Sequence, residues 1–397
     1  MRNAKKWVLV YLLVLAVGIA SYMAVCFKAN TLGYFTNIKG IPYFYNDDYA
    51  RKIKSTYLYE HRREYEGVLV GGSKSGAVDP SLMTELTGLN YYNMYMNVGN
   101  FPDYLRYITF LVENCEVKEI TLVLSSLETK FKDQSSRGNA FVPPAILTGN
   151  PFRRITECLS YLMTDIKTTL EELADPPSNR INISDFLSDG MRNRYNAVRS
   201  HNKDPEEFVR SMVLNNQKSQ LKQLFRQAAS KQTARPLCLK CLQQIYTLCN
   251  EHGVTLRVIV GPSFLLDKAR YECEEYYDYL EDIVKICGEV WDFSDYNRFN
   301  MNPFNYYDRS HYSKELANIM LYRVFDTPQA KGYEDFGMIL TKDNVHEAMN
   351  QRRASFEKYK EEFETTGEIT YYGLSDDSYI PWAPQWTTPG IEAYQQS

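Results

Sequence analysis

Short aliphatic segments alternate with helix-like segments over much of this chain, and this alternation restricts the fold more than any other feature. In the first half, we expect strands at Gly67–Val70, Tyr91–Met96 and Glu119–Leu124. We expect helices between them at Pro80–Gly88 and Phe101–Cys115. Strands that are joined through helices need crossover connections, so the pattern predicts a parallel sheet.

The same alternation returns in the second half of the chain. It predicts two more strands, Val254–Val260 and Glu289–Phe293. The helices expected there are Pro236–His252, Phe264–Cys287, Lys314–Phe325 and Thr341–Phe363. The sequence therefore predicts an α/β fold with a five-stranded parallel sheet.

The two halves are separated by a polar region between about residues 130 and 235. It contains Pro143-Pro144 and two helical stretches, Arg154–Leu173 and Glu206–Ala229. We interpret this region as a helical insertion. Two roles stay open for it, a lid over a functional site and a bracing element.

The amino terminus has the composition of a membrane anchor. The 21 residues from Trp7 to Phe27 carry no charge, and Arg2, Lys5 and Lys6 precede them. Such a run is long enough to cross a bilayer as one helix, and the cations on one side favour a cytoplasmic amino terminus. A cleavable signal peptide is the alternative, although its apolar region is usually shorter. We therefore expect a single-pass protein of the cell membrane whose remaining domain is extracytoplasmic.

Charge and cysteine content exclude some classes of protein. The net charge is −4 and no run of basic residues occurs, so we expect no nucleic-acid partner. Of the eight cysteines, seven lie outside the apolar run, and an odd number over so long a chain does not suggest a disulfide framework. Cys238 and Cys241 form one CxxC without a second pair, which favours a buried pair over a metal site. We expect no metal and no cofactor.

The first predicted strand runs into the turn Gly71-Gly72-Ser73-Lys74-Ser75-Gly76. The turn does not continue as a Walker loop, because Ala77 and Val78 stand where Lys and Ser or Thr are needed. Its glycines do not have the Rossmann spacing, and Ser75 stands where a nucleophile elbow has glycine. The turn would still place Ser73 at the carboxyl edge of the sheet beside unpaired backbone N–H groups.

A serine nucleophile needs a base, and the base needs a partner that fixes its tautomer. Among the five histidines of the chain, His311 has an aspartate, Asp308, three residues before it in a loop that leads into a helix. This spacing puts both side chains on the same side of one turn. Ser73, His311 and Asp308 are therefore the candidate catalytic triad.

A Gly-x-Ser turn after the first strand, together with Asp308-Arg309-Ser310-His311 near the end of the domain, resembles the SGNH (GDSL-like) hydrolases. Within that superfamily the chain is most similar to membrane-anchored polysaccharide O-acetylation proteins of the AlgJ/AlgX kind and to the teichoic-acid D-alanylation protein DltD. The resemblance implies a flavodoxin-like three-layer sandwich. Composition and pattern along the chain, taken together with this resemblance, predict the following division: a tail and anchor at 1–30, a stalk at 31–66, an SGNH-like domain at 67–335 with its insertion at about 130–235, and a C-terminal helix and tail at 336–397.

In that family an oxyanion hole is made by the N–H of the nucleophile, a glycine N–H after the second strand and an asparagine after the third. The resemblance thus assigns the oxyanion donors to Ser73 and to Gly99, which stands in Asn97-Val98-Gly99-Asn100. The third strand is followed by Ser125-Ser126-Leu127-Glu128, so the asparagine is missing. Removing one such donor typically slows a reaction about 10²–10³-fold.

The expected function is acyl transfer, most simply of acetyl, or ester hydrolysis on a cell-surface polysaccharide or teichoic-acid-like polymer. A membrane-bound O-acyltransferase partner is implied by the resemblance alone. The missing asparagine motivates a second hypothesis, a non-catalytic glycan-binding or assembly component with a decayed site. A third, a secreted lipase-type esterase, would need an apolar acyl groove.

Overall fold

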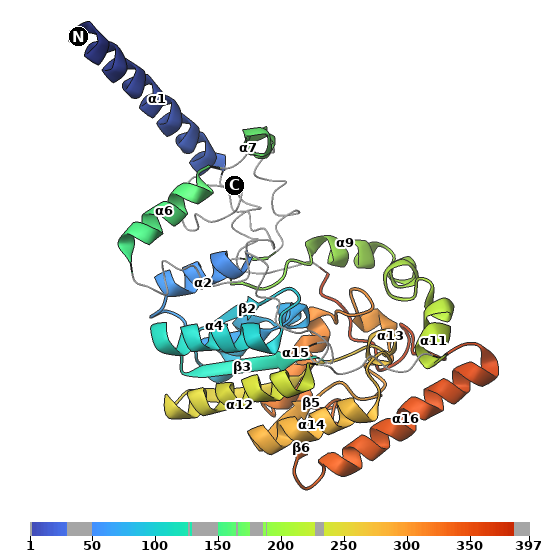
Figure 1. The fold of residues 1–397 in the computed structure, drawn as a ribbon. Coiled ribbons are helices and arrows are strands. Elements are labelled where there is room, and N and C mark those ends of the chain that lie inside the picture. Colours follow the sequence, from blue (N-terminus) through green and yellow to red (C-terminus); the bar gives the residue numbers. More distant parts are fainter. Residues whose placement is uncertain are drawn as a thin grey trace. The chain divides into compact units, whose positions relative to one another are not determined.

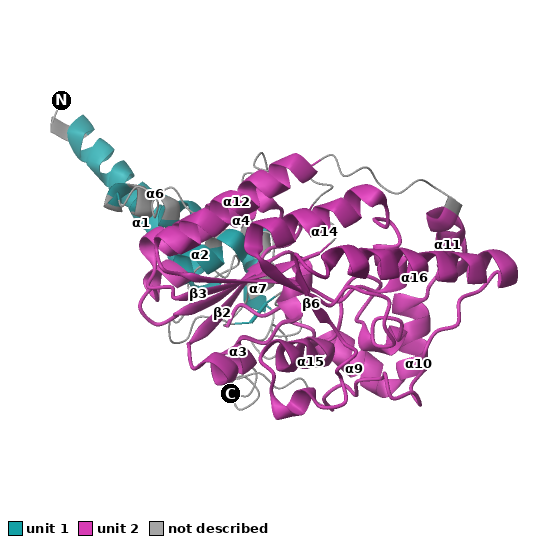
Figure 2. Cartoon of the chain, turned by 90° about the horizontal axis from the view of Figure 1, so that it is seen from below, with its two compact units in different colours: residues 1–57, 141–187, 388–397 teal, residues 58–140, 188–387 magenta. Residues whose placement is uncertain are grey.

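The computed structural model describes residues 2–29, 50–125, 128, 150–163, 166–174, 186–187, 189–226 and 234–384. The chain divides into two compact units. Figure 2 colours them separately: the smaller holds residues 1–57, 141–187 and 388–397, and the larger holds residues 58–140 and 188–387. The predicted insertion is thus divided between the two units.

The smaller unit contains the expected amino-terminal helix, α1 (Arg2–Ala29). Within it Ala4–Ala29 is long and apolar enough to cross a membrane. Two short helices, α6 (Pro151–Tyr161) and α7 (Ile166–Ala174), belong to the same unit. They replace the single helix expected at Arg154–Leu173. Helix α2 (Ala50–Glu60) lies in the segment that we interpreted as a stalk, whose residues 31–49 are outside the described part of the chain.

The larger unit is built on a six-stranded sheet (Figure 1). Its strands are β1 (Gly67–Gly71), β2 (Tyr91–Tyr95), β3 (Glu119–Leu124), β4 (Thr255–Val260), β5 (Glu289–Asp292) and β6 (Met338–Thr341). Their order in the sheet is β2-β1-β3-β4-β5-β6. The first five are the predicted strands, and all their pairings are parallel.

The expectation of a purely five-stranded parallel sheet was wrong at one edge. Strand β6 pairs with β5 and runs antiparallel to it. It has only four residues, and a short apolar run cannot be assigned to a strand or a helix by periodicity alone. Pairing with the backbone of β5 determines its conformation.

Helices follow the strands as expected and cover the sheet. Their bounds are α3 (Pro80–Thr87), α4 (Phe101–Asn114), α12 (Arg235–Glu251), α14 (Glu274–Cys287) and α15 (Lys314–Val324). Helix α12 packs against both α4 and α14. Figure 2 shows these three on one side of the sheet and α3 and α15 on the other. Every residue of β1, β2 and β3 is buried, in keeping with a sheet that is covered on both faces.

The described part of the insertion within the larger unit is helical. It comprises α9 (Tyr195–Lys203), α10 (Pro205–Phe208), a π-helical turn (Val209–Val213) and α11 (Gln217–Arg226). The helix expected at Glu206–Ala229 is therefore interrupted. The remaining short helices are a 3₁₀ turn at Ser73–Ala77, α13 (Leu265–Lys268), and 3₁₀ turns at Pro303–Asn305 and Pro328–Ala330.

The chain after β6 forms α16 (Val345–Thr366), close to the predicted helix, and then a segment without helix or strand up to residue 384. This segment had no recognisable sequence pattern, yet it packs on the loop that precedes Asp308. The Ile380 N–H donates to Asn305 Oδ1 at 2.9 Å, and Trp382 Nε1 donates to the Phe304 carbonyl at 2.9 Å. The tail thus supports the loop that leads to Asp308 and His311.

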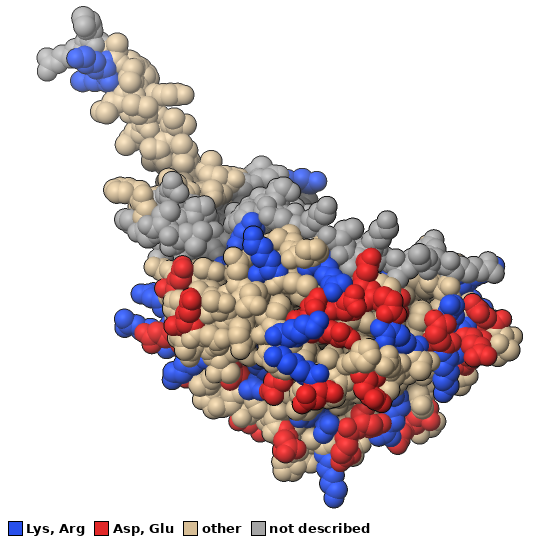
Figure 3. All heavy atoms as spheres, turned by 60° about the horizontal axis from the view of Figure 1, so that its bottom comes forward, with Lys and Arg blue, Asp and Glu red and all other residues tan. Residues whose placement is uncertain are grey.

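Cationic and anionic side chains are intermixed on the face of the larger unit in Figure 3. This distribution agrees with the small net charge of −4.

Candidate active site

Ser73 stands where β1 ends and a 3₁₀ turn begins. A side chain at Gly71 would lie 2.4 Å from the Val123 carbonyl oxygen, so the strand can approach β3 closely only with glycine there. The turn directs Ser73 to the carboxyl edge of the sheet. Its N–H is the first of the turn and has no acceptor within the turn itself.

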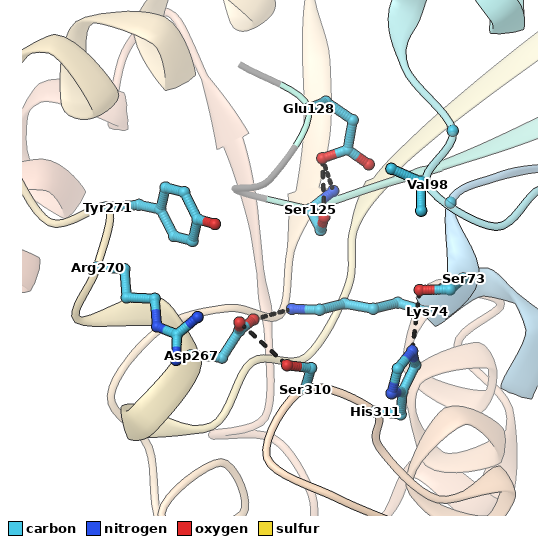
Figure 4. A pocket seen from close by; sticks show the side chains of 12 residues that line it. Ser73, Lys74, Val98, Ser125, Glu128, Asp267, Arg270, Tyr271, Ser310 and His311 are labelled. Atoms are coloured by element: carbon cyan, nitrogen blue, oxygen red, sulfur yellow. Dashed lines mark hydrogen bonds and ion pairs between the residues drawn. The ribbon is translucent and has the colours of Figure 1, made fainter. Parts of the chain in front are cut away.

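The structure brings Ser73, His311 and Asp308 together (Figure 4 shows the first two). His311 Nε2 lies 2.9 Å from Ser73 Oγ. His311 Nδ1 lies 2.8 Å from Asp308 Oδ2 and 2.9 Å from Oδ1. These are the contacts that the sequence predicted for a nucleophile, a base and a residue that orients the base.

The loop around Asp308 is held by its own backbone. Asp308 Oδ1 accepts the N–H groups of Ser310 at 2.8 Å and of His311 at 3.0 Å. The Tyr307 N–H donates to the His311 carbonyl at 2.8 Å. Ser313 then caps α15 by accepting the Leu316 N–H. His311 therefore lies in a defined turn just before a capped helix.

The charges around the triad favour a neutral imidazole beside an ionised carboxylate. Burial lowers the pKa of His311, and Arg194 and Arg192 lower it further against the opposing effect of Asp308. Burial alone would raise the pKa of Asp308, but its bond with His311, the charge of His311 and the charge of Arg194 hold that pKa well below its usual range. At neutral pH His311 can accept a proton, and Asp308 can stabilise the resulting cation.

Gly99, the predicted oxyanion donor, lies in the same pocket as Ser73 and His311. A Cβ at this position would come within 2.7 Å of the Tyr104 ring. The Gly99 N–H donates to the Met96 carbonyl at 3.1 Å, so a role as oxyanion donor requires this bond to be shared or released. Before it stands Val98, a β-branched residue with φ of 51°, a conformation that costs about 1–3 kcal/mol.

The residues where an asparagine was sought form a different arrangement. Glu128 Oε2 accepts the N–H of Ser125 at 2.9 Å and its hydroxyl at 2.8 Å. Glu128 Oε1 accepts the Tyr104 hydroxyl at 3.1 Å. Burial raises the pKa of Glu128 to about 7, although Ser125 and the charge of Lys74 act in the opposite direction. A carboxyl group thus lines the pocket at the end of β3.

The pocket has a volume of about 240 Å³. Its lining residues are Gly72, Ser73, Lys74, Val98, Gly99, Ser125, Glu128, Asp267, Arg270, Tyr271, Ser310 and His311. Figure 4 shows the Lys74 side chain crossing the site from the Ser73 turn to Asp267. A small acyl group fits a space of this size beside Ser73.

A buried ion pair joins the Ser73 turn to α13. Lys74 Nζ lies 2.6 Å from Asp267 Oδ2, and the two side chains are 8% and 9% exposed. Lys74 also donates to Ser263 Oγ at 3.2 Å. Removing either charge would destabilise the protein, because the remaining buried charge would be desolvated without a compensating partner.

The same Asp267 connects to the loop of Asp308 and His311. Ser310 Oγ donates to Asp267 Oδ1 at 3.2 Å, and the Ser310 N–H donates to Asp308. These contacts, the Asp308–His311–Ser73 bonds and the peptide bond from Ser73 to Lys74 form a closed ring of residues, which we call the Lys74 ring. In order, its members are Ser73, Lys74, Asp267, Ser310, Asp308 and His311. It ties together the loops after β1, β4 and β5.

Sequence reasoning missed Lys74, Asp267 and Glu128 as parts of the site. Asp267 and Glu128 follow β4 and β3, and the carboxyl ends of parallel strands meet at one edge of a sheet, so their positions were a usable signal. Lys74 adjoins the nucleophile, but nothing in the sequence shows the direction of its side chain.

Among the described residues, no group of three or more His, Cys, Asp or Glu side chains is placed to hold a metal ion. The eight cysteines all lie in the described ranges and are free. Cys238 and Cys241 are buried in α12, and the Cys238 thiol donates to the Glu128 carbonyl at 3.5 Å. Burial raises the pKa of Cys238 to about 12, which makes it a poor metal ligand or nucleophile.

No protein-family model matches this chain, and no curated protein matches it.

Proposed function

We propose that this protein is an extracytoplasmic serine-dependent acyltransferase or esterase of the SGNH type, which acts on a cell-surface polysaccharide. The observation that carries the proposal is the continuous hydrogen-bonded series Ser73–His311–Asp308, with contacts of 2.9 and 2.8 Å at the carboxyl edge of the sheet. The strand order β2-β1-β3-β4-β5, which flavodoxin-like sheets share, supports a three-layer SGNH fold.

The first half of the reaction acylates the serine. His311 Nε2 takes the proton of Ser73 Oγ as this oxygen attacks the ester carbonyl carbon. The tetrahedral intermediate collapses when the bond from carbon to the leaving oxygen breaks, and His311 returns the proton to that oxygen. Asp308 stabilises the imidazolium that exists between the two proton transfers.

The second half releases the acyl group. A sugar hydroxyl, or water, gives its proton to His311 and attacks the acyl-Ser73 carbonyl. Ser73 then leaves as an alkoxide and recovers the proton. A sugar acceptor makes the protein a transferase, whereas water makes it an esterase.

In both halves the developing oxyanion needs backbone donors at the turn. The Ser73 N–H begins a 3₁₀ turn, and the Gly99 N–H lines the pocket. We propose both as donors, with Gly99 turning from Met96 toward the substrate. A pocket of about 240 Å³ favours acetyl over long acyl chains, and hence an acetyltransferase or acetylesterase over a lipase.

We propose that α1 holds the protein in the cell membrane with its amino terminus in the cytoplasm. Three cations precede the apolar run, in agreement with that orientation. In this arrangement a membrane-bound O-acyltransferase would deliver the acyl group, and a cell-surface polysaccharide or teichoic-acid-like polymer would accept it.

A fluorophosphonate probe tests the proposed chemistry directly, because it modifies only an activated serine. We expect labelling of the wild-type protein and none of Ser73→Ala. Ser75→Ala is the matched control, since Ser75 lies two residues away and donates its hydroxyl to the Gly72 carbonyl at 2.8 Å. If the folded wild-type protein is not labelled, or if Ser73→Ala is labelled equally, the proposal is wrong.

A second function, glycan binding without catalysis, is favoured by two hydrogen bonds in the site. The Gly99 N–H is engaged by Met96, and Ser125 is engaged by Glu128 where the family has asparagine. Under this alternative, a folded protein would bind an acetylated polysaccharide equally well as wild type and as Ser73→Ala, and neither would react with the probe.

A further inference from the structure

One side of α6 and of the turn after it carries apolar side chains that are exposed. Phe152, Ile155, Leu159 and Met163 are 76%, 55%, 41% and 58% exposed. At 3.6 residues per turn, these positions fall within an arc of about 80° on one side of the helix. Exposed apolar residues are usually scattered singly, so a continuous stripe indicates an interaction surface.

Helix α7 carries further exposed apolar side chains in the same unit. Leu170 and Leu173 are 55% and 38% exposed. Helix α7 packs against the end of α1, where Thr169 Oγ1 lies 3.8 Å from Cys26 Sγ and both residues are buried. In Figures 1 and 2, α6 also lies near this end of α1. We call the six exposed side chains of α6, its following turn and α7 the apolar stripe.

The length of α1 bears on what the apolar stripe contacts. In α1, all residues from 4 to 21 are exposed. Other parts of the smaller unit cover α1 only from Tyr22 onward. From Trp7 to residue 21 the bare apolar part measures about 22 Å. The hydrocarbon core of a bilayer is about 30 Å thick. A spanning α1 therefore needs its last two turns, on which α7 packs, to lie within or at the edge of the lipid.

We propose that the apolar stripe lies in the outer interfacial layer of the membrane and contacts lipid. The proposal rests on the proposed anchoring by α1 and is independent of the chemistry at Ser73. Amphipathic helices of this kind lie in the plane of the interface, with the apolar side toward the acyl chains. The anchor then holds the protein at two places, through a spanning helix and through a surface contact.

The test uses the full-length protein in lipid nanodiscs of phosphatidylcholine and phosphatidylglycerol. An environment-sensitive fluorescent amino acid is incorporated in place of Ile155, and quenching by lipids with spin-labelled acyl chains is measured. Ser160 is the matched control, because it is exposed and lies about 140° around the helix from Ile155. Val14 in the bare part of α1 reports on the anchoring itself.

We expect strong quenching at positions 14 and 155 and at least threefold weaker quenching at 160. Quenching at 14 but not at 155 overturns the proposal and leaves the anchoring intact. A blue-shifted emission at 155 without quenching also overturns it, because the stripe would then be covered by protein. Absence of quenching at 14 refutes the anchoring and, with it, this proposal. Near-UV circular dichroism of each variant verifies that the fold is retained.

Discussion

Replacing Lys74 by methionine tests whether the Lys74 ring positions the base. The substitution keeps the length and the apolar stem of the side chain but leaves Asp267, whose side chain is 9% exposed, without its cation. Removing one partner of a buried ion pair costs about 3–5 kcal/mol. At roughly 2–4 °C per kcal/mol for a domain of this size, we expect Tm to fall by about 6–20 °C.

Stability alone does not show a positioning role, so a second variant is needed. Lys74→Met combined with Asp267→Leu removes both charges, and such replacements are often neutral or stabilising. We expect the double variant to recover most of the lost Tm. Its rate of fluorophosphonate labelling should remain at least fivefold below wild type, because Ser310 no longer has the acceptor at 3.2 Å that holds the loop of His311.

The control is the ion pair Lys314–Asp79, with 2.7 Å between the charged atoms and side chains 16% and 11% exposed. It lies outside the Lys74 ring. We expect Lys314→Met to lower Tm and to leave the labelling rate of the folded protein within twofold of wild type. If the double variant at Lys74 and Asp267 is labelled at the wild-type rate, the ring does not position the base.

Three further predictions concern single residues. Burial lowers the pKa of His311, so the labelling rate should fall on acidification with a midpoint below pH 6.5, which is the usual pKa of histidine. Between pH 6.5 and pH 8 the rate should be constant. A midpoint above pH 7 contradicts this prediction. Asp308→Asn should slow labelling roughly 10³–10⁴-fold with an unchanged fold, as measured by the second-order rate constant, whereas a loss below tenfold would mean that Asp308 does not orient the base. Val98→Gly relieves a φ of 51° and should raise the free energy of unfolding by about 1 kcal/mol in a urea titration, whereas Gly99→Ala, whose Cβ would meet the Tyr104 ring at 2.7 Å, should lower it.

The parallel strands could be predicted because each carries its own local signal. The runs at β1 and β3 are β-branched and aliphatic, and both are buried throughout. Strand β6 could not be predicted in this way, since its four residues become a strand only by pairing with β5. The interruption between α6 and α7 was also missed, because the two helices together have the composition of one.

The triad could be predicted because its order along the chain and the Asp308-x-x-His311 spacing have a direct chemical meaning. The Lys74 ring could not, because its contacts join residues that are 43 and 193 positions apart. Only the folded sheet edge brings those loops together. The hydrogen bond of the Gly99 N–H to Met96 depends on the backbone conformation around Val98, which the sequence does not reveal.

The packing of the tail on the loop before Asp308 has a consequence for biosynthesis. Asn305 Oδ1 accepts a hydrogen bond from the Ile380 N–H at 2.9 Å, and the Phe304 carbonyl accepts one from Trp382 Nε1 at the same distance. These supports are among the last parts of the described chain to leave the ribosome. The nucleophile turn, by contrast, is made some three hundred residues earlier. A nascent chain therefore carries the Ser73 turn long before the loop of Asp308 and His311 gains these two supports.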